Sequence, residues 1–339
     1  MLRLIFLTLI SFLLQGTISF AGGYTVDHTS SDLSQVPDEW ISKAKQDLHI
    51  AYNHTSHGSQ LITGINALEG YFGSKYAWTN TSTGDGTSLS LRDHGISGGV
   101  NDLSQGDSSV NYQGVDVAKW AKATYEFLDD QNNNHINVIM WSWCNISGHD
   151  IPLYLSSMQW LIDQFSSGGS HARAADHPVQ FVYITAHANG GGEGDSSDFR
   201  NNQIRDYCSS HDSILFDFSD LENYDPDENY YLDKLLRDNL DYDSDNSGSV
   251  DSNWASEYLV RYPTSELYKL TKGDGAYGGT GSCAHSNDPD NDARLNCVLK
   301  GRAAWYLFAR LAGWDPDNAG GSNSTAAMVG INTFLLQTN

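Results

Sequence analysis

The fold is indicated by the stretch Leu48-His49-Ile50-Ala51-Tyr52, followed after one residue by His54-Thr55-Ser56-His57-Gly58-Ser59. A short apolar run that ends in polar residues predicts a buried strand. Residues 60–71 then repeat apolar side chains with helical spacing, at Leu61, Ile65 and Leu68. The whole stretch therefore predicts a strand, a polar turn and a helix in direct succession.

The same alternation continues along the chain. Further buried strands are expected at 137–141, 179–185 and 214–217, and helices at 115–128, 151–165, 201–208 and 295–311. Alternating strands and helices predict parallel strands joined by crossover helices, with helices on both faces of the sheet. We expect a three-layer α/β/α fold with a mainly parallel central sheet. In such folds ligands bind beyond the carboxyl ends of the strands.

Three segments lie outside this plan. Residues 1–21 read as a secretory signal peptide, because a basic start precedes a short apolar run and Ser19-Phe20-Ala21 resembles a cleavage site. Residues 219–275 form an acidic, loop-rich insertion within a single domain that spans 22–314. Residues 315–339 are expected to be a C-terminal tail. We therefore expect a secreted protein that does not cross the membrane after cleavage.

The composition limits the partners. The formal net charge is −23, from 42 acidic and 19 basic residues. Such a charge repels nucleic acid and anionic membranes, so neither is an expected partner. Export and the content of aromatic residues favour an extracellular polysaccharide or glycan as substrate. The sequence does not indicate the oligomeric state.

Four residues next to the predicted elements occur in a characteristic order along the chain. Ser56 follows the first strand, Gly98 lies in Gly95-Ile96-Ser97-Gly98, Asn145 follows the strand at 137–141, and His285 precedes the last helix. This order resembles the SGNH (GDSL-like) hydrolase superfamily, which implies an SGNH/flavodoxin-like fold. The resemblance implies that Ser56 attacks an acyl carbonyl and His285 acts as base. It also implies that the backbone N–H groups of Ser56 and Gly98, with the Asn145 amide, form an oxyanion hole.

The chain departs from the family pattern at the base. Ser282 stands where the family has the Asp that orients the histidine. Asp274, Asp288 or a backbone carbonyl are the alternative orienting groups. Ser59 is a competing nucleophile, because it also lies in a Gly-Ser turn.

Several more side chains are expected near the same edge of the sheet. His54, His57, Trp143, His187 and Asn189 all follow predicted strands, so we expect them to shape a substrate pocket. A metal bound by histidines, His149 among them, is an alternative. Catalysis by the Ser–His pair needs no cofactor.

The acidic insertion contains a sequence similar to a calcium loop. Its expected oxygen ligands are Asp243, Asp245, Ser247, Ser249 and Asp251. Gly248 occupies the sharp-turn position, while Trp254 stands where an EF-hand has its bidentate Glu. We expect a structural Ca²⁺ site, with a merely solvated acidic loop as the alternative.

The four cysteines allow two disulfides in an exported chain. Three pairings are open. Cys283 with Cys297 is favoured because it closes a short loop around His285, which leaves Cys144 with Cys208. Free buried thiols are the alternative to these disulfides.

These observations favour a secreted serine esterase that removes acyl groups, with acetyl expected, from a polysaccharide or glycan. One alternative keeps the fold but makes the protein a polysaccharide lyase, a glycosidase or a metal-dependent hydrolase. Another is a carbohydrate-binding protein without catalysis.

Overall fold

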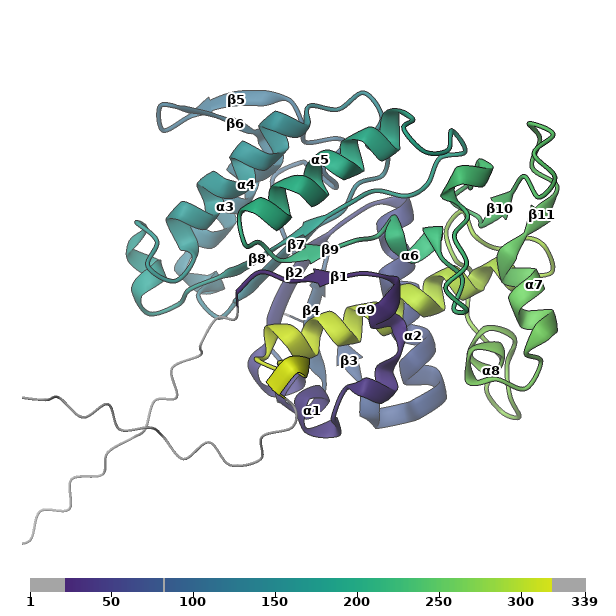
Figure 1. Cartoon of the computed structure of the whole chain (residues 1–339). Coiled ribbons are helices and arrows are strands. Elements are labelled where there is room, and N and C mark those ends of the chain that lie inside the picture. Colours follow the sequence, from purple (N-terminus) through teal and green to yellow (C-terminus); the bar gives the residue numbers. More distant parts are fainter. Residues whose placement is uncertain (1–21, 82, 319–339) are drawn as a thin grey trace, which may run out of the picture.

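The computed structural model describes residues 22–81 and 83–318, and Figure 1 shows its arrangement. The predicted signal peptide and most of the predicted tail lie outside the described residues. The chain forms a three-layer α/β/α fold around a seven-stranded sheet, as expected. Its strand order is β1-β9-β8-β7-β2-β4-β3, and the pairings are parallel. The strands are β1 Thr25–Val26, β2 His49–Asn53, β3 Trp78–Thr79, β4 Leu89–Asp93, β7 Val138–Trp141, β8 Gln180–Ile184 and β9 Leu215–Phe216.

The five central strands run in the order β4-β2-β7-β8-β9. Counted along the chain, this is second, first, third, fourth and fifth, the doubly wound flavodoxin-like order. The chain changes direction across the sheet between β2 and β7, where crevices for ligands form at the carboxyl edge. The register aligns Asn53 with Trp141 and Tyr52 with Asp93, so these strands end at the same level.

Helices cover both faces of the sheet. One face packs against α1, α2 and α9, and the other against α3, α4 and α5 (Figure 1). Two apolar cores follow from this, one on each side of the sheet. The helices are α1 Asp38–Asp47, α2 Ser59–Phe72, α3 Lys119–Asp129, α4 Ile151–Phe165, α5 Ser196–Ser210, α6 Asp220–Asn223, α7 Trp254–Arg261, α8 Glu266–Lys272 and α9 Leu295–Leu311.

Helices α2 and α9 approach each other unusually closely. A Cβ atom on Gly64 of α2 would lie 2.0 Å from the carbonyl oxygen of Cys297 and 2.6 Å from the backbone nitrogen of Gly301, both on α9. Only glycine permits this distance between two helix backbones. The crossing brings the turn before α2, which carries Ser56, close to the loop before α9, which carries His285.

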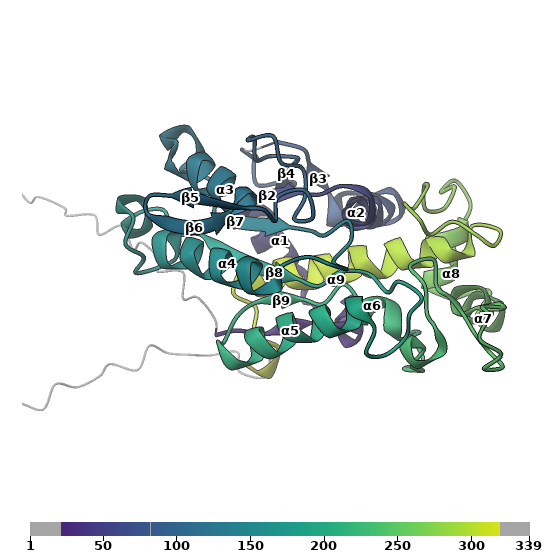
Figure 2. The same ribbon diagram turned by 90° about the horizontal axis from the view of Figure 1, so that it is seen from above.

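One predicted helix is shorter than expected. Residues 115–118 form strand β6, Val115–Ala118, and the helix α3 begins only at Lys119. Strand β6 pairs antiparallel with β5, Ser109–Tyr112. Val115 and Val117 alternate along a strand as well as they fit a helix, so their spacing did not separate the two structures. Figure 2 shows this hairpin lying over α3 and α4.

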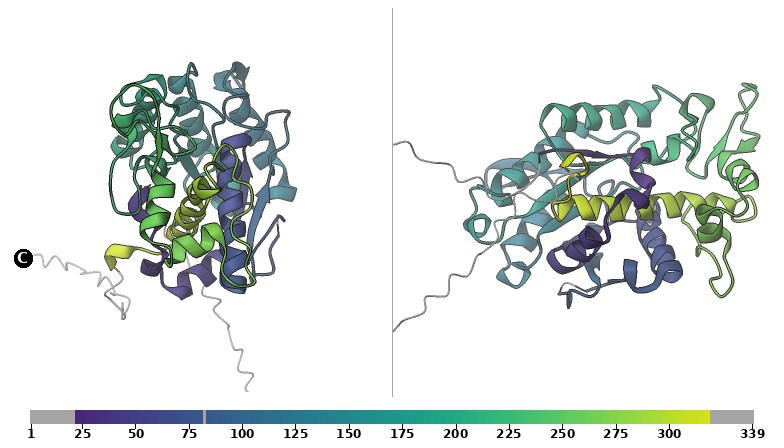
Figure 3. Two further views of the ribbon diagram at one scale, coloured as in Figure 1. Left: turned by 90° about the vertical axis from the view of Figure 1, so that its right-hand side faces the viewer. Right: turned by 60° about the horizontal axis from the view of Figure 1, so that its bottom comes forward.

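The insertion at 219–275 is more ordered than its composition predicts. It holds helices α6, α7 and α8 and a short antiparallel pair, β10 Asp241–Tyr242 with β11 Ser252–Asn253. Scattered apolar residues such as Leu240, Trp254 and Leu270 are fully buried in it. The insertion packs at the carboxyl end of the sheet, at the right of Figure 1, and Figure 3 shows the same end from two other directions. Within residues 22–81 and 83–318, no helix combines the length and the apolar character needed to cross a membrane.

Of the two predicted disulfides, one is present. Cys283 and Cys297 form a disulfide, whereas Cys144 and Cys208 are free thiols, so the second expected disulfide is wrong. Cys144 follows β7 at the carboxyl edge of the sheet. Helix α5 starts at the same edge and runs back for 15 residues, about 22 Å at 1.5 Å per residue. Cys208 in its last turn therefore lies at the opposite edge, and burial raises the pKa of its thiol to about 12.

Candidate active site

Ser56 occupies the turn between β2 and α2 in a backbone conformation that favours glycine. Its φ is 40°, in the left-handed region, which costs a non-glycine residue about 1–3 kcal/mol. Contacts on both sides hold the turn: Thr55 Oγ1 donates to Asp102 Oδ2, and Tyr52 Oη donates to the Gly58 carbonyl at 2.9 Å. The strained turn leaves the Ser56 side chain partly exposed at the carboxyl edge of the sheet.

The Ser56 hydroxyl meets the imidazole of His285, although the two residues lie 229 positions apart. Ser56 Oγ is hydrogen-bonded to His285 Nε2. The His285 side chain is 44% exposed, so a substrate can reach both groups. This pair is the one predicted from the sequence.

A carboxylate that the sequence did not suggest lies next to His285. The other ring nitrogen of His285, Nδ1, faces Asp238 Oδ2 at 3.8 Å. The two predicted carboxylates are elsewhere: Asp274 pairs with Lys269 at 3.2 Å, and Asp288 is exposed on a loop. Asp238 comes from the acidic insertion, where no motif marks it.

Asp238 also accepts a hydrogen bond from a second histidine. His57 Nε2 donates to Asp238 Oδ2 at 2.8 Å. The ring of His57 lies between those of His285 and His187, with centroids 4.0 Å and 3.7 Å away and interplanar angles of 8° and 13°. Burial alone would raise the pKa of Asp238, but the hydrogen bond from His57 and the neighbouring histidines bring it below its ordinary value.

A buried polar network joins the three loops that carry these groups. At its centre, Lys300 of α9 donates to Gln60 of α2 and to Glu222 of α6, and all three side chains are fully buried. Glu222 accepts from the Ala188 amide at 2.7 Å, next to His187. Gln60 donates to the Ala284 carbonyl at 2.6 Å, next to His285.

Asn296 and Ser286 extend the network to Asp238. Asn296 Nδ2 donates to Glu222 Oε1 at 3.2 Å and to the Asp238 carbonyl at 3.1 Å, and Ser286 Oγ donates to the same carbonyl at 2.8 Å. The segments that carry His187, Asp238 and His285, and the first turn of α2 beside Ser56, are therefore tied to the Lys300–Glu222 pair. A lysine inside the otherwise buried helix α9 was the sequence signal for this network, and the sequence reading did not use it.

The remaining predicted catalytic groups lie on neighbouring loops. The loop with Gly98 is held by Asn53, whose side chain donates to the Ile96 carbonyl at 2.9 Å and accepts from the Ile96 amide at 2.8 Å. Asn145 Oδ1 accepts from the Ser147 amide at 2.7 Å. Within the described residues neither Gly98 nor Asn145 has a hydrogen bond to Ser56, so their oxyanion role stays a prediction. Ser59 Oγ donates to the Ser56 carbonyl at 2.6 Å. The hydroxyl of this competing nucleophile is therefore already engaged in a hydrogen bond within the helix turn.

The predicted substrate-binding residues differ in their surroundings. Trp143 is 1% exposed, and its indole N–H donates to the Ile184 carbonyl at 3.1 Å, so it fills the core and does not line a pocket. His54 and His57 are also buried, the first hydrogen-bonded to Asp93 at 2.7 Å. His187 joins the histidine stack. Asn189 follows His187 by two residues, and its side-chain amide donates to Ser197 Oγ at 2.8 Å.

Two groups of side chains near the site have the composition of metal ligands. One is His57, His187 and Asp238, and the other is His54, Asp93 and His94, each with ligand atoms within 4.8 Å of one another. His57 in the first group and His54 in the second each have a buried Nδ1 atom without a partner among the described residues.

The other ring nitrogen of each histidine is already used. Nε2 of His57 donates to Asp238, and Nε2 of His54 is hydrogen-bonded to Asp93. A histidine that binds a metal normally gives its second N–H to a carboxylate, and such an arrangement leaves Nδ1 as the ligand atom. His149 is hydrogen-bonded to Asp107 at 2.6 Å. A metal held by these histidines stays an alternative to a hydrogen-bonded histidine cluster.

The acidic loop uses its side chains to close its own turn. Asp243 accepts from the amides of Ser247 at 3.0 Å and Gly248 at 2.7 Å. Asp251 accepts from the Ser244 amide at 2.9 Å, and Ser247 Oγ points to the Ser249 carbonyl at 3.5 Å. Asp245 also accepts from the Ser247 amide, at 3.0 Å. The Ca²⁺ site stays a prediction.

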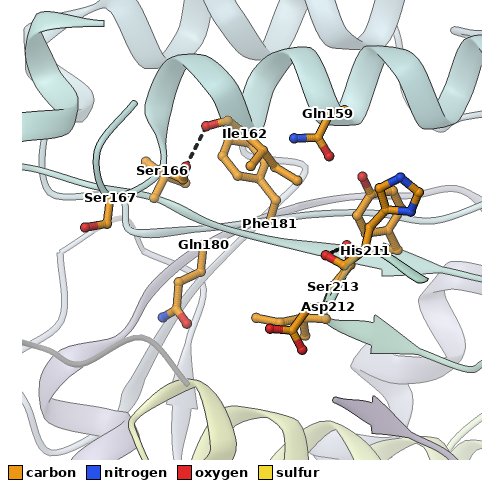
Figure 4. A pocket seen from close by; sticks show the side chains of 12 residues that line it. Gln159, Ile162, Ser166, Ser167, Gln180, Phe181, His211, Asp212 and Ser213 are labelled. Atoms are coloured by element: carbon orange, nitrogen blue, oxygen red, sulfur yellow. Dashed lines mark hydrogen bonds between the residues drawn. The ribbon is translucent and has the colours of Figure 1, made fainter. Parts of the chain in front are cut away.

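A separate pocket opens at the opposite edge of the sheet. It lies between α4 and the first residues of β8 and β9, with Gln159, Phe181 and His211 among its lining (Figure 4). The strands begin there, so the pocket is remote from the Ser56–His285 pair.

No family model, no curated protein and no solved structure matches this chain.

Proposed function

We propose that this chain is a secreted serine esterase that removes acyl groups, with acetyl expected, from a polysaccharide or glycan. The observation that carries the proposal is the hydrogen bond between Ser56 Oγ and His285 Nε2, with Asp238 facing the other nitrogen of the same ring. A nucleophile, a base and an orienting carboxylate in this order form the constellation of serine hydrolases.

The proposed reaction has two stages. Ser56 Oγ attacks the ester carbonyl while His285 Nε2 takes its proton, and the imidazolium that forms is stabilised by Asp238. His285 then protonates the leaving alcohol, which leaves an acyl group on Ser56. In the second stage His285 takes a proton from water while the water oxygen attacks the acyl-enzyme. The His285 imidazolium then returns this proton to Ser56 Oγ as the acyl–oxygen bond breaks, which releases the carboxylic acid and regenerates Ser56.

The exposure of the site supports a large polar substrate. His285 is nearly half exposed, and Ser56 is partly exposed above a buried polar floor. A polymer can lie across such an open edge, whereas a lipid chain requires an apolar cavity to enclose it. The acidic composition and the predicted signal peptide support an extracellular neutral glycan.

The test compares Ser56→Ala with Ser59→Ala. Acetate release from p-nitrophenyl acetate and acetylated xylan should fall at least about a hundredfold in Ser56→Ala and less than about threefold in Ser59→Ala. A serine-reactive fluorophosphonate should label Ser56 in the wild-type chain, as read by peptide mass spectrometry. Full activity of Ser56→Ala would refute the proposal. Activity that resists the fluorophosphonate but is lost to a chelator would favour the metal-dependent alternative, and glycan binding without turnover would favour the non-catalytic one.

A further inference from the structure

His57 follows the proposed nucleophile directly but points away from the solvent. Its side chain is 6% exposed, and its ring is enclosed by the rings of His187 and His285. Because His57 is buried and stacks on the proposed base, a change at His57 is expected to affect His285. Its two contacts, the parallel stack and the hydrogen bond to Asp238, involve the two partners on which Ser56 depends.

The stack restricts the plane of His285. The two rings are within 8° of parallel at a centroid distance of 4.0 Å, so rotation of the His285 ring would drive it into the His57 ring. His285 needs this support because its side chain is 44% exposed and its own backbone is left-handed, with a φ of 63°. A half-exposed imidazole without such support samples several rotamers.

The hydrogen bond restricts Asp238. Oδ2 is 2.8 Å from His57 Nε2 and 3.8 Å from His285 Nδ1, so one carboxylate oxygen is shared between the two rings. The bond to His57 is already formed, while the contact with His285 is about 1 Å too long for a hydrogen bond. His285 gains a positive charge when it takes the Ser56 proton, and the contact is then expected to shorten.

The surroundings keep His57 neutral. It faces Asp238, His187 and His285, with Glu222 farther off; burial is the main influence and lowers its pKa, the two histidines lower it further, and Asp238 and Glu222 oppose them. A neutral His57 has one N–H, which it gives to Asp238, and a bare Nδ1, which accords with that atom having no partner among the described residues. A second positive charge beside His285 is thereby avoided during catalysis.

We propose that His57 is a positioning residue of the esterase site: its ring fixes the plane of His285, and its Nε2–H holds the Asp238 carboxylate where His285 can share it. This inference rests on the proposed function. Within the described residues no hydrogen bond joins His57 to Ser56 Oγ, and its contacts to the proposed catalytic groups are with His285 and Asp238, so it acts through these two.

Two substitutions separate the two contacts. His57→Phe keeps a flat ring in the stack and removes the donor to Asp238. His57→Gln keeps an amide N–H near the position of Nε2 and removes the ring. His211→Phe is the matched control, because His211 also stacks, on Tyr207 at 3.9 Å, but lies at the opposite edge of the sheet.

Both His57 variants should lower kcat on p-nitrophenyl acetate by about ten- to a hundredfold with KM within about twofold, because positioning acts on the transition state. In His57→Phe, Asp238 is left to His285 alone, so the acid limb of the kcat/KM profile should move to higher pH. In His57→Gln that limb should stay in place. His211→Phe should match the wild type in each measurement.

Wild-type kcat in His57→Phe, or a loss of kcat without movement of the acid limb, would overturn the inference. If His57→Phe fails to fold, as read by thermal unfolding, His57→Gln decides it: wild-type kcat in a folded His57→Gln refutes the role of the stack. Full activity of Ser56→Ala would instead remove the proposed function itself, so the two failures are distinguishable.

Discussion

Replacing Lys300 by Met should destabilise the fold by about 3 kcal/mol, because it leaves a buried carboxylate without its cation. Lys300 and Glu222 are each fully buried, and the distance from Lys300 Nζ to Glu222 Oε1 is 2.5 Å. Methionine has a similar volume and can occupy the space over the Phe218 ring, where Nζ now lies 3.6 Å from the centroid. The change therefore removes charge and hydrogen bonds more than packing.

The magnitude follows from what Glu222 retains. Breaking a buried ion pair on one side costs about 3–5 kcal/mol. Glu222 keeps the hydrogen bonds from the Ala188 amide at 2.7 Å and from Asn296 at 3.2 Å, so the lower end of that range applies. Adding Glu222→Gln to Lys300→Met removes the orphaned charge and should recover about 2 kcal/mol, a coupling of the size found between contacting residues.

Urea unfolding, followed by tryptophan fluorescence, measures the free energy of unfolding of each variant. The control is Lys269→Met, whose ion pair with Asp274 has both side chains well exposed and is screened by water, so its loss should leave the free energy of unfolding nearly unchanged. A free energy of unfolding of Lys300→Met within about 0.5 kcal/mol of the wild-type value would refute the reasoning. So would a double variant less stable than the single one.

Four further outcomes are expected. Asp238→Asn should lower kcat on p-nitrophenyl acetate by about 10²–10⁴ with little change in thermal stability, and unchanged kcat would exclude Asp238 as the orienting group. Gly64→Ala should lower stability by about 1–3 kcal/mol, since its Cβ would lie 2.0 Å from a carbonyl oxygen of α9; a neutral effect in urea unfolding contradicts that close crossing. Replacing Cys283 and Cys297 by Ser should cost about 3 kcal/mol, for a disulfide that spans 14 residues, and should lower kcat, because the loop it closes carries the base; equal kcat would separate the disulfide from the site. Burial lowers the pKa of His57 below 6.5 in the fold, so its contribution to stability is full above about pH 6.5 and is lost as the pH falls towards the folded pKa; the urea midpoint should drop less between pH 7 and pH 5 in His57→Phe than in the wild type.

The regular elements of the fold were predictable because they repeat simple patterns. The helix 151–165 and the helix 295–311 have the bounds predicted from their apolar residues. The parallel sheet followed from the alternation of strands and helices. Short elements were missed. Strand β1 has two residues, too few for any pattern, and the helices α7 and α8 have eight and seven residues, about two turns each, too short for a clear apolar period. The burial of α8 depends on packing against α9, which the sequence does not display.

Part of the site was predictable for a different reason. Ser56 and His285 stand beside elements whose ends meet at one edge of the sheet, so the order of motifs sufficed to pair them. Asp238 has no such context, since it lies in an insertion and reaches the site only through the packing of that insertion. Trp143 shows the opposite error: its position after a strand suggested a pocket, but the side chain turns into the core.

Under the proposed function, the serine at position 282 has a physical explanation. An Asp three residues before the base would orient it locally, from within the same loop. In the proposal this carboxylate is Asp238 instead, on a separate segment that is tied to the base through Ser286, Asn296 and His57. The long acidic insertion is thus part of the proposed catalytic apparatus, and removing it should abolish the activity even if the sheet and its helices still fold. A deletion that spared the sheet and kept full esterase activity would show that His285 is oriented by some other group.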